Sequence, residues 1–286
     1  MNFTKMHGAG NDFILVETND AQRNWSKLVI AMCDRHFGIG GDGLILVMPS
    51  DKADVRMREF NPDGSEAEAC GNGIRCLARF VYESGLVNPK ADQITIETMV
   101  GIRKLKLLKE RGKLIGIQAG MGKPAFGAND IPVVLQKSDE KIVYLKSMLS
   151  YSVTIDRTKL LLNFVSMGNP HAVFFQQSPV ADFPLTQLGP KVEHLAIFPK
   201  RTNFEVARVI NRRQIEVRVW ERGVGETLAC GSGACAVAVA AQLYGSADNK
   251  VDIKLPGGIL QIAWDGAGEV LMSGPAERVF AGEWPE

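Results

Sequence analysis

The chain has little of what marks several protein classes. Histidine occurs four times in 286 residues, aromatic residues make up 7%, and the formal net charge is only +1. A charge balance so close to zero gives no reason to expect a nucleic-acid or membrane-surface partner. No apolar run approaches the length of a membrane span, and the first residues lack the apolar core of a signal peptide. We therefore expect a cytoplasmic protein, and we leave a homodimer open.

Signatures of metal and cofactor binding are also missing. The five cysteines do not follow the spacing of zinc sites, and no His-x3-His pair occurs. An odd number of cysteines in a reducing compartment disfavours disulfides. The glycines of 38–43 match a dinucleotide fingerprint in letters only, because the loop follows a predicted helix and precedes a strand. We predict no metal and no cofactor.

Two short stretches share one unusual pattern. Ala69-Cys70-Gly71-Asn72-Gly73 and Ala229-Cys230-Gly231-Ser232-Gly233 both place a cysteine before two glycines, and an apolar-periodic segment follows each. The pattern predicts a cysteine at each helix N-terminus, where unpaired N–H groups and the helix dipole lower a thiol pKa and bind anions. Most cysteines are inert core residues, and we assign that role to Cys33, Cys76 and Cys235.

The surroundings of the two cysteines form an internal repeat. Gly10-Asn11-Asp12 matches Gly168-Asn169-Pro170 at an offset of 158 residues, and Asp42 roughly matches Asn203. Strands are expected at 13–16, 44–47, 55–60, 161–165, 172–175, 204–210 and 215–220, and helices at 24–36, after 70 and at 231–244. The Gly- and Pro-rich stretch 120–130 is a candidate linker. Pseudo-symmetric halves would place the two repeated cysteines on opposite walls of one cleft.

Two thiols on opposite sides of a carbon suit the inversion of that carbon. One, as thiolate, removes a proton, and the other, as thiol, returns a proton to the opposite face, so the two must differ in protonation. A free cysteine has a pKa of roughly 8.5 and can be tuned for either role. We expect His171 and Glu221 to do the tuning. The N–H groups of Gly71–Asn72 and Gly231–Ser232 are expected to hold a carboxylate and stabilise an enolate-like charge.

Six stretches carry a resemblance to a known family. They are KMHGAGNDFI (5–14), RHFGIGGDGL (35–44), FNPDGSEAEACGNGIRC (60–76), MGNPH (167–171), RTNFEV (201–206) and WERGVGETLACGSGACA (220–236). With them the chain resembles the diaminopimelate epimerases, a family of pyridoxal-independent amino-acid epimerases, over nearly its full length. The resemblance implies a cofactor-independent isomerase that interconverts LL- and meso-diaminopimelate, a small amino-acid substrate, in the synthesis of lysine and peptidoglycan precursors.

The resemblance also implies the architecture. It predicts an α/β (α+β) fold of two pseudo-symmetric domains, each a β-barrel-like, mostly antiparallel sheet around a central helix, with the active site in the cleft between them. The N-terminal domain, with Cys70, is expected at 1–118 plus 275–286, because the last strands of the family can cross back to it. The C-terminal domain, with Cys230, is expected at 119–274.

The roles of single residues are carried over motif by motif. The resemblance makes Cys70 and Cys230 the acid–base pair, with His171 and Glu221 tuning the thiols. The residues that it assigns to substrate binding are Asn11, Asn61, Gly71, Asn72, Asn169, Asn203, Glu221, Arg222, Gly231 and Ser232. Some family members carry Phe-Asp-Gln where this chain has Gly41-Asp42-Gly43, so a glutamine contact to substrate is missing or supplied elsewhere.

Two alternatives stay open. A proline or hydroxyproline racemase has a similar pair of cysteines, although Arg222 and the asparagines of the binding set favour a substrate with a distal amino-acid head. A thiol redox protein cycling a Cys70–Cys230 disulfide belongs to another class, and the absence of a C-x-x-C motif argues against it.

Overall fold

The chain forms two compact units. The computed structural model describes residues 1–67, 71–135 and 141–285, so Cys70 lies outside the described residues. Unit 1 comprises Met1–Gly120 and Ser273–Glu286, and unit 2 comprises Met121–Met272. Within the described ranges, every helix is too short or too polar to cross a bilayer.

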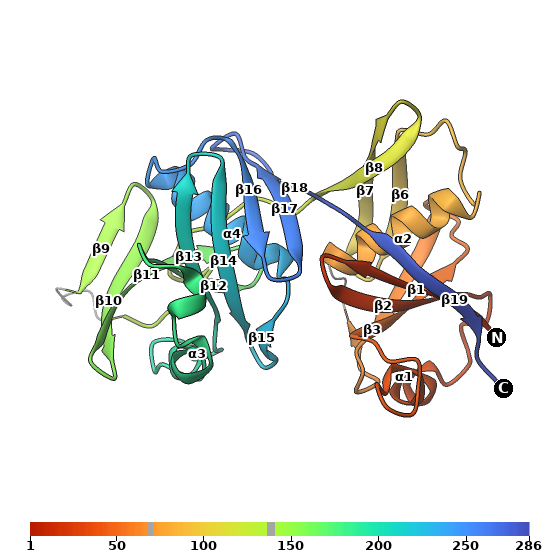
Figure 1. Cartoon of the computed structure of the whole chain (residues 1–286), viewed down its shortest axis with the longest axis horizontal. Coiled ribbons are helices and arrows are strands. Elements are labelled where there is room, and N and C mark those ends of the chain that lie inside the picture. Colours follow the sequence, from red (N-terminus) through yellow and green to blue (C-terminus); the bar gives the residue numbers. More distant parts are fainter. Residues whose placement is uncertain (68–70, 136–140, 286) are drawn as a thin grey trace. The chain divides into compact units, whose positions relative to one another are not determined.

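Unit 1 wraps a mostly antiparallel sheet around one helix (Figure 1). Its helices are α1 (Trp25–Cys33) and α2 (Gly71–Glu83). Its strands are β1 (Asn2–Gly8), β2 (Asn11–Glu17), β3 (Gly43–Met48), β4 (Val55–Phe60), β5 (Glu66–Ala67), β6 (Gln93–Thr98), β7 (Gly101–Glu110), β8 (Lys113–Gly120) and β19 (Glu277–Glu283). They pair in the order β19-β1-β2-β3-β4-β6-β7-β8, antiparallel except for β2–β3 and β4–β6.

Strand β3 shows how the sequence builds two cores in unit 1. All six of its residues are buried. Ile45 and Val47 pack in the cluster that contains α2, whereas Leu44 and Leu46 pack in the cluster that contains α1. Successive side chains of a strand point to opposite faces, so a strand covered on both faces is a continuous apolar run. The run Leu44–Met48 is therefore explained by one helix on each side of the sheet.

Helix α1 is shorter than the expected 24–36. Asn24 caps its start by accepting a hydrogen bond from the Lys27 N–H at 3.2 Å. At the other end the Asp34 carboxylate accepts the N–H groups of His36 and Phe37, each at 2.7 Å. A side chain that binds the backbone two and three residues on favours a turn over a helix. The helix therefore ends at Cys33.

Unit 2 has the same plan around α4 (Figure 1). Its helices are the 3₁₀ turn η1 (Val180–Asp182), α3 (Leu185–Glu193) and α4 (Gly231–Leu243). Its strands are β9 (Ile142–Leu145), β10 (Met148–Ile155), β11 (Thr158–Ser166), β12 (Pro170–Phe175), β13 (Asn203–Asn211), β14 (Gln214–Glu221), β15 (Gly225–Thr227), β16 (Lys250–Leu255) and β17 (Gly258–Ala263), and β18 (Leu271–Gly274) runs across the boundary of the units. The pairing order is β9-β10-β11-β12-β13-β14-β16-β17, with only β12–β13 and β14–β16 parallel.

The internal repeat is confirmed by these pairings. The strands β1-β2-β3-β4-β6-β7 and the strands β11-β12-β13-β14-β16-β17 pair in the same order. In both series the second and fourth pairs are parallel and the others antiparallel. The fold class is therefore the expected one, with two similar sheet-dominated units. One match was off by a residue: Phe13 pairs with Gly43 and His171 pairs with Asn203, so Gly43, and not Asp42, is equivalent to Asn203.

Helix α4 is apolar nearly all round, and ten of its residues are buried. A helix of this kind belongs inside a protein layer, which is how unit 2 uses it. Its end lies at the expected place: the Tyr244 N–H donates to the Ala240 carbonyl, and Gly245 follows with a φ of 75°. Glycine adopts this left-handed conformation without strain and so stops the helix.

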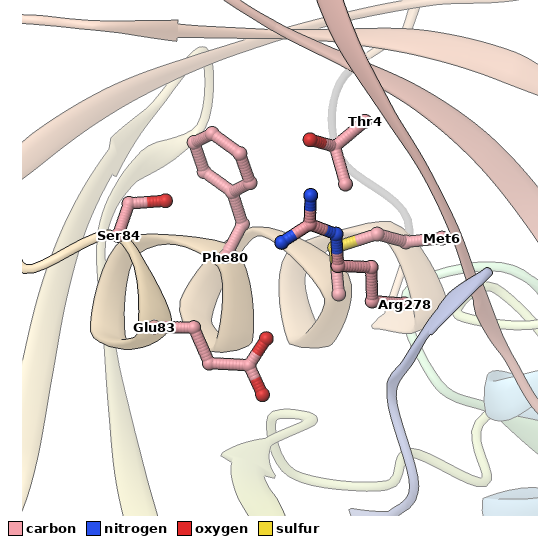
Figure 2. Close-up of a pocket in the computed structure, with 6 residues that line it drawn as sticks. All are labelled: Thr4, Met6, Phe80, Glu83, Ser84 and Arg278. Atoms are coloured by element: carbon pink, nitrogen blue, oxygen red, sulfur yellow. The ribbon is translucent and has the colours of Figure 1, made fainter. Parts of the chain in front are cut away.

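A surface pocket of about 180 Å³ opens beside α2 in unit 1. Figure 2 shows Phe80 and Glu83 on the last turn of α2 and Ser84 directly after it, with the Arg278 guanidinium of β19 extending toward Met6. Thr4 completes the lining. None of the predicted site residues that the structure describes lines this pocket, so the pocket is not the predicted site.

Candidate active site

Two equivalent turns place Asn11 and Asn169. In unit 1, Ala9 and Gly10 form a two-residue turn with φ values of 54° and 84°, and Asn11 follows as the first residue of β2. In unit 2, Gly168 has a φ of 92° and Asn169 directly precedes β12. Because glycine takes positive φ without strain, each Gly-Asn pair turns the chain and leaves the asparagine where its strand begins.

Cys230 begins α4 as its N-cap residue. Its backbone is extended, with φ −119° and ψ 114°, and its Sγ accepts a hydrogen bond from the Gly233 N–H at 3.4 Å. The Ser232 Oγ lies 3.6 Å from the same sulfur. The residue is only 5% exposed. The expected helix start is therefore present, and the thiol is enclosed in it.

The pKa of this thiol moves in the direction opposite to the expected one. Burial raises the pKa of Cys230 well above its ordinary value, and the carboxylates of Glu221 and Glu205 raise it further. The hydrogen bonds from Ser232 and Gly233 lower it by less. The helix start lowers the pKa as predicted, through the Gly233 N–H, but the net shift is upward because removing water from around a thiolate costs more than the helix N-terminus contributes. Cys230 is a neutral thiol here at neutral pH.

Glu221 is the acidic group in direct contact with the sulfur. It ends β14, and its carboxylate accepts a hydrogen bond from the Thr227 hydroxyl. A further hydrogen bond joins it to Cys230. Burial raises the pKa of Glu221 and these hydrogen bonds lower it, and the net effect is upward. The contact is the one that a thiol-tuning role requires.

His171 pairs with the carboxylate of Glu205. It lies on β12, fully buried, with Nδ1 at 2.7 Å from Glu205 Oε1 and Nε2 at 2.9 Å from Asn169 Oδ1. Strand β13 lies parallel to β12 and brings Glu205 under the histidine ring.

Glu205 is the site residue that the sequence analysis missed. Its side chain is completely buried, and its Oε2 has no hydrogen-bond partner among the described residues. Its neighbours Phe204 and Val206 are apolar and buried. Glutamate is almost never fully buried unless it is paired. A lone acid within an apolar strand is the signal that could have identified it.

The polar residues of unit 2 connect to this group. Asn169 Nδ2 donates to Ser232 Oγ at 3.3 Å. Asn203 donates to the Pro170 carbonyl at 2.8 Å and accepts the Arg222 N–H at 2.9 Å. The Arg222 side chain is exposed and donates to a carbonyl on the surface, that of Lys200 at 3.3 Å. The structure therefore joins Asn169 to the start of α4 and Asn203 to the Arg222 backbone, while the Arg222 side chain lies at the surface.

Unit 1 supplies a second, smaller network. Asn72, buried in the first turn of α2, donates to Asn11 Oδ1 at 3.1 Å and accepts from Arg75 Nη2 at 2.8 Å. Asn11 Nδ2 in turn donates to Asp42 Oδ2 at 2.8 Å. Arg35 holds the other oxygen of Asp42 at 2.7 Å. Asp42 thus orients the Asn11 amide, a role that the sequence did not indicate.

Asn61 is the unit 1 prediction that bonds elsewhere: its Nδ2 donates to Ser65 Oγ at 3.0 Å, within its own turn. Gly71, the first residue of α2, is joined to the network through Arg75, whose Nη1 donates to the Gly71 carbonyl at 3.0 Å. At Gly43 a Cβ atom would lie 2.8 Å from the Phe60 carbonyl oxygen, so this backbone leaves no room for the glutamine that some relatives carry there.

Three cysteines have the inert role that was assigned to them. Cys33, Cys76 and Cys235 are buried free thiols. Burial raises the pKa of Cys33 to about 11, so that thiol stays protonated at neutral pH.

Comparisons with known proteins agree with this geometry. The family model of diaminopimelate epimerase matches residues 3–127 and 163–279. The diaminopimelate epimerase of Moorella thermoacetica is 47% identical over 288 residues, covering 100% of this chain and 99% of the relative. That of Acetivibrio thermocellus is 48% identical over 285 residues, covering 99% and 98%.

Solved structures give the fold. A PhzF-family phenazine biosynthesis protein of Bacillus anthracis matches with a TM-score of 0.72 at 16% identity, covering 100% of this chain and 99% of that one. A probable proline racemase of Agrobacterium radiobacter gives 0.69 at 13% identity, covering 99% and 92%. The chain thus has the same fold as these two proteins. It belongs to the diaminopimelate epimerase family and is an isomerase.

Proposed function

We propose that this chain interconverts LL- and meso-diaminopimelate in the cytoplasm, on the route to lysine and peptidoglycan precursors, with Cys70 and Cys230 as the two bases. Family membership supports the substrate. The observation that carries the mechanism is the setting of Cys230. Its sulfur lies between an acceptor, the Glu221 carboxylate, and two donors, the Ser232 hydroxyl and the Gly233 N–H. A sulfur so placed can give up a proton as a thiol or receive one as a thiolate.

The proposed reaction moves one proton at each face of the α-carbon. One cysteine, as thiolate, takes the α-proton and becomes a thiol, and the electron pair of the C–H bond passes into an enolate-like carboxylate. The other cysteine gives its proton to the opposite face and becomes a thiolate. Turnover therefore leaves the two thiols with exchanged protonation states, and the reverse reaction uses them in exchanged roles.

Each helix start supplies the charge stabilisation that this reaction needs. The first N–H groups of a helix have no acceptor within the helix, and the dipole favours an anion there. In α4 these donors belong to Gly231 and Ser232, and in α2 to Gly71 and Asn72. Donors that meet charge as it develops give the largest single contribution in many enzymes. We further propose that the two units act as domains, 1–118 with 275–286 and 119–274, each contributing one cysteine.

Deuterium exchange in heavy water tests the proposal. Wild-type protein, without added cofactor, should incorporate deuterium at Cα while it inverts LL-diaminopimelate, as followed by mass spectrometry and chiral chromatography. Cys70→Ser and Cys230→Ser should each lose epimerisation in both directions, because serine is far too weak a base. Each variant should still exchange the α-proton of the isomer that faces its remaining thiol, and the two variants should favour opposite isomers.

Three results would contradict the assignment. Near wild-type epimerisation by either variant would make that cysteine structural. Inversion of proline or hydroxyproline in place of diaminopimelate would favour the racemase alternative. A requirement for a reversible Cys70–Cys230 disulfide, with no exchange at Cα, would favour a thiol redox protein.

A further inference from the structure

A continuous chain of polar contacts leads from a buried carboxylate to the Cys230 sulfur. Glu205 Oε1 lies 2.7 Å from His171 Nδ1, and His171 Nε2 lies 2.9 Å from Asn169 Oδ1. Asn169 Nδ2 donates to Ser232 Oγ at 3.3 Å, and Ser232 Oγ lies 3.6 Å from Cys230 Sγ. Strands β12 and β13 and the first turn of α4 contribute these five residues. This series of contacts begins at Glu205, an acid to which the sequence resemblance assigns no role, and ends at the sulfur of Cys230, a proposed catalytic residue.

The orientation of the Asn169 amide, with Oδ1 toward the ring of His171, sets the number of hydrogens in this series of contacts. A neutral imidazole carries a hydrogen on only one nitrogen, yet both nitrogens of His171 face oxygen atoms. Either both nitrogens are protonated beside an ionised Glu205, or Glu205 is itself protonated and donates to Nδ1. In both cases the pair is electrically neutral, as a site without solvent access requires, and Nε2 carries a hydrogen for Asn169.

The hydrogen bonds then all run in one direction. His171 Nε2–H donates to Asn169 Oδ1, which leaves the Asn169 amide N–H to donate to Ser232 Oγ. With its oxygen accepting from Asn169, the Ser232 hydroxyl turns its hydrogen toward Cys230 Sγ. Hydrogen bonds in such a series polarise one another, and donors to a sulfur favour its thiolate.

The internal repeat shows that the fold does not need this pair. With His171 equivalent to Phe13 and Asn203 to Gly43, Glu205 is equivalent to Ile45. Phe13 and Ile45 are both buried apolar residues of unit 1. Unit 1 therefore builds the same strands with an apolar pair, where unit 2 buries a histidine and a glutamate.

Gly73 and Gly233, which are equivalent in the repeat, confirm that Ile45 and Glu205 occupy equivalent positions. A Cβ on Gly73 would lie 3.0 Å from Ile45 Cδ1, and a Cβ on Gly233 would lie 2.8 Å from Glu205 Oε1. The same Gly233 Cβ would lie 3.4 Å from Cys230 Cβ. The absence of a side chain at Gly233 lets the carboxylate lie directly under the first turn of the helix that Cys230 begins.

We propose that Glu205 is a positioning residue of the proposed epimerase. Glu205 keeps a hydrogen on His171 Nε2, and this directs the Asn169–Ser232 hydrogen bonds toward Cys230. These hydrogen bonds stabilise the thiolate form of Cys230. The titratable groups that act on the sulfur are Glu221 from β14 and Glu205 from β13, and His171 from β12 contacts Glu205 and acts on Glu221. Glu221 accepts from the thiol and favours its protonated form, while the series from Glu205 favours the thiolate. Cys230 can therefore act in both directions of the proposed reaction, on which this inference rests.

The test is Glu205→Gln, which keeps the size of the side chain and removes its charge and its acidic proton. With the glutamine Oε1 in the place of Glu205 Oε1, a neutral His171 donates through Nδ1–H and has no hydrogen on Nε2. The Asn169 amide then turns over, and the Ser232 hydroxyl donates to it instead of to the sulfur. The readout is the rate of iodoacetamide alkylation of the Cys230 peptide across pH, by mass spectrometry, together with kcat and KM. Losing one hydrogen bond to a charged sulfur should lower both the alkylation rate at neutral pH and kcat about tenfold to a hundredfold, with KM little changed.

Two further variants make the test decisive. Glu216→Gln removes a carboxylate of the same unit that pairs with Lys254 at the surface, and it should leave both readouts at wild-type values. The double variant H171F/E205I copies the apolar pair of unit 1; it should fold, as judged by circular dichroism, and lose Cys230 reactivity as Glu205→Gln does.

Opposite results have a clear meaning. If Glu205 acted only as a negative charge near the sulfur, its removal would make Cys230 more reactive, and that outcome overturns the proposal. The proposal is also overturned if the Glu205→Gln and Glu216→Gln variants have the same rate of Cys230 alkylation and the same kcat. Alkylation needs no substrate, so these results stand even if the chain fails to epimerise diaminopimelate, and the two failures are separable.

Discussion

Adding one methyl group at Gly189 tests whether the packing of α3 on Trp220 holds the loop of Arg222 in unit 2. It lies inside α3, and a Cβ there would lie 2.6 Å from Cδ2 and 2.7 Å from Cγ of Trp220. The same helix ends at Glu193, whose carboxylate accepts the Trp220 indole N–H at 2.8 Å and the Gly223 N–H at 2.9 Å. The packing of α3 on Trp220 therefore holds the loop that carries Arg222.

Two opposing contributions decide the effect of Gly189→Ala. Alanine stabilises a helix interior by about 1 kcal/mol relative to glycine. Carbon atoms normally stay about 3.5–4.0 Å apart, so the helix or the indole has to move by roughly 1 Å. Overpacking of a core costs about 1–3 kcal/mol, and a rigid ring at 2.6 Å places this site at the upper end. We expect a net loss of about 2 kcal/mol.

Thermal unfolding followed by circular dichroism measures the loss. For a chain of this size about 2 kcal/mol lowers the midpoint by roughly 4–8 °C, and KM should rise because the Arg222 loop shifts. Gln187→Ala, at an exposed position of the same helix, is the control for helix propensity and should leave the midpoint nearly unchanged. In a Trp220→Leu background, Gly189→Ala should cost far less, because contacting residues do not contribute additively. A raised midpoint, or an equal cost in both backgrounds, would refute the steric reasoning.

Two further predictions concern charged groups. Arg222→Ala should weaken substrate binding by about 2–5 kcal/mol with an unchanged circular dichroism spectrum, and an unchanged KM and kcat would remove Arg222 from the site. Asp12 should matter for acid stability: burial alone would raise its pKa, but hydrogen bonds from Arg35 and Lys5 hold that pKa well below its ordinary value. Its contribution is thus complete above about pH 4 and is lost as the pH falls toward the folded pKa. Asp12→Asn should flatten the acid side of the plot of unfolding midpoint against pH, and a curve parallel to the wild type would contradict this.

Sequence patterns predicted the elements whose signals are local. Leu44–Met48 is a continuous apolar run between glycine and proline, so its strand was clear. The segment after Cys230 is apolar at every turn and stops at a glycine, so the helix and its end were clear as well. The repeat followed from the glycine contexts, because a positive φ or a helix start demands the same residues in both halves.

Other elements were missed because their local signals are mixed. Helix α3 contains Gly189 and Pro190, two residues that normally argue against a helix interior. Tertiary packing on Trp220 overrides them. Strands β9 and β10 had not been predicted, although β10 is bonded on both sides, to β9 and to β11.

The chemistry of the site depends on burial, which a sequence does not display. A helix start was visible in the letters around Cys230, but the enclosure of its sulfur and the second carboxylate were not. The sign of the pKa shift therefore came out wrong. The pairing of His171 with Glu205 depends on which residues of two parallel strands lie side by side, and that register is a property of the folded chain.

The pairing of β1 with β19 has a consequence for the order in which the chain can fold. The two strands run antiparallel along their length, and Met1 and Trp284 exchange backbone hydrogen bonds at 2.7 and 2.8 Å. The partner of the first strand is thus synthesised after the whole of unit 2. Unit 2 is one continuous segment, and its sheet can close while the chain is still on the ribosome. Unit 1 has to keep the edge of β1 unpaired until residues 277–283 emerge, so its last backbone hydrogen bonds form only after all of unit 2 has been synthesised.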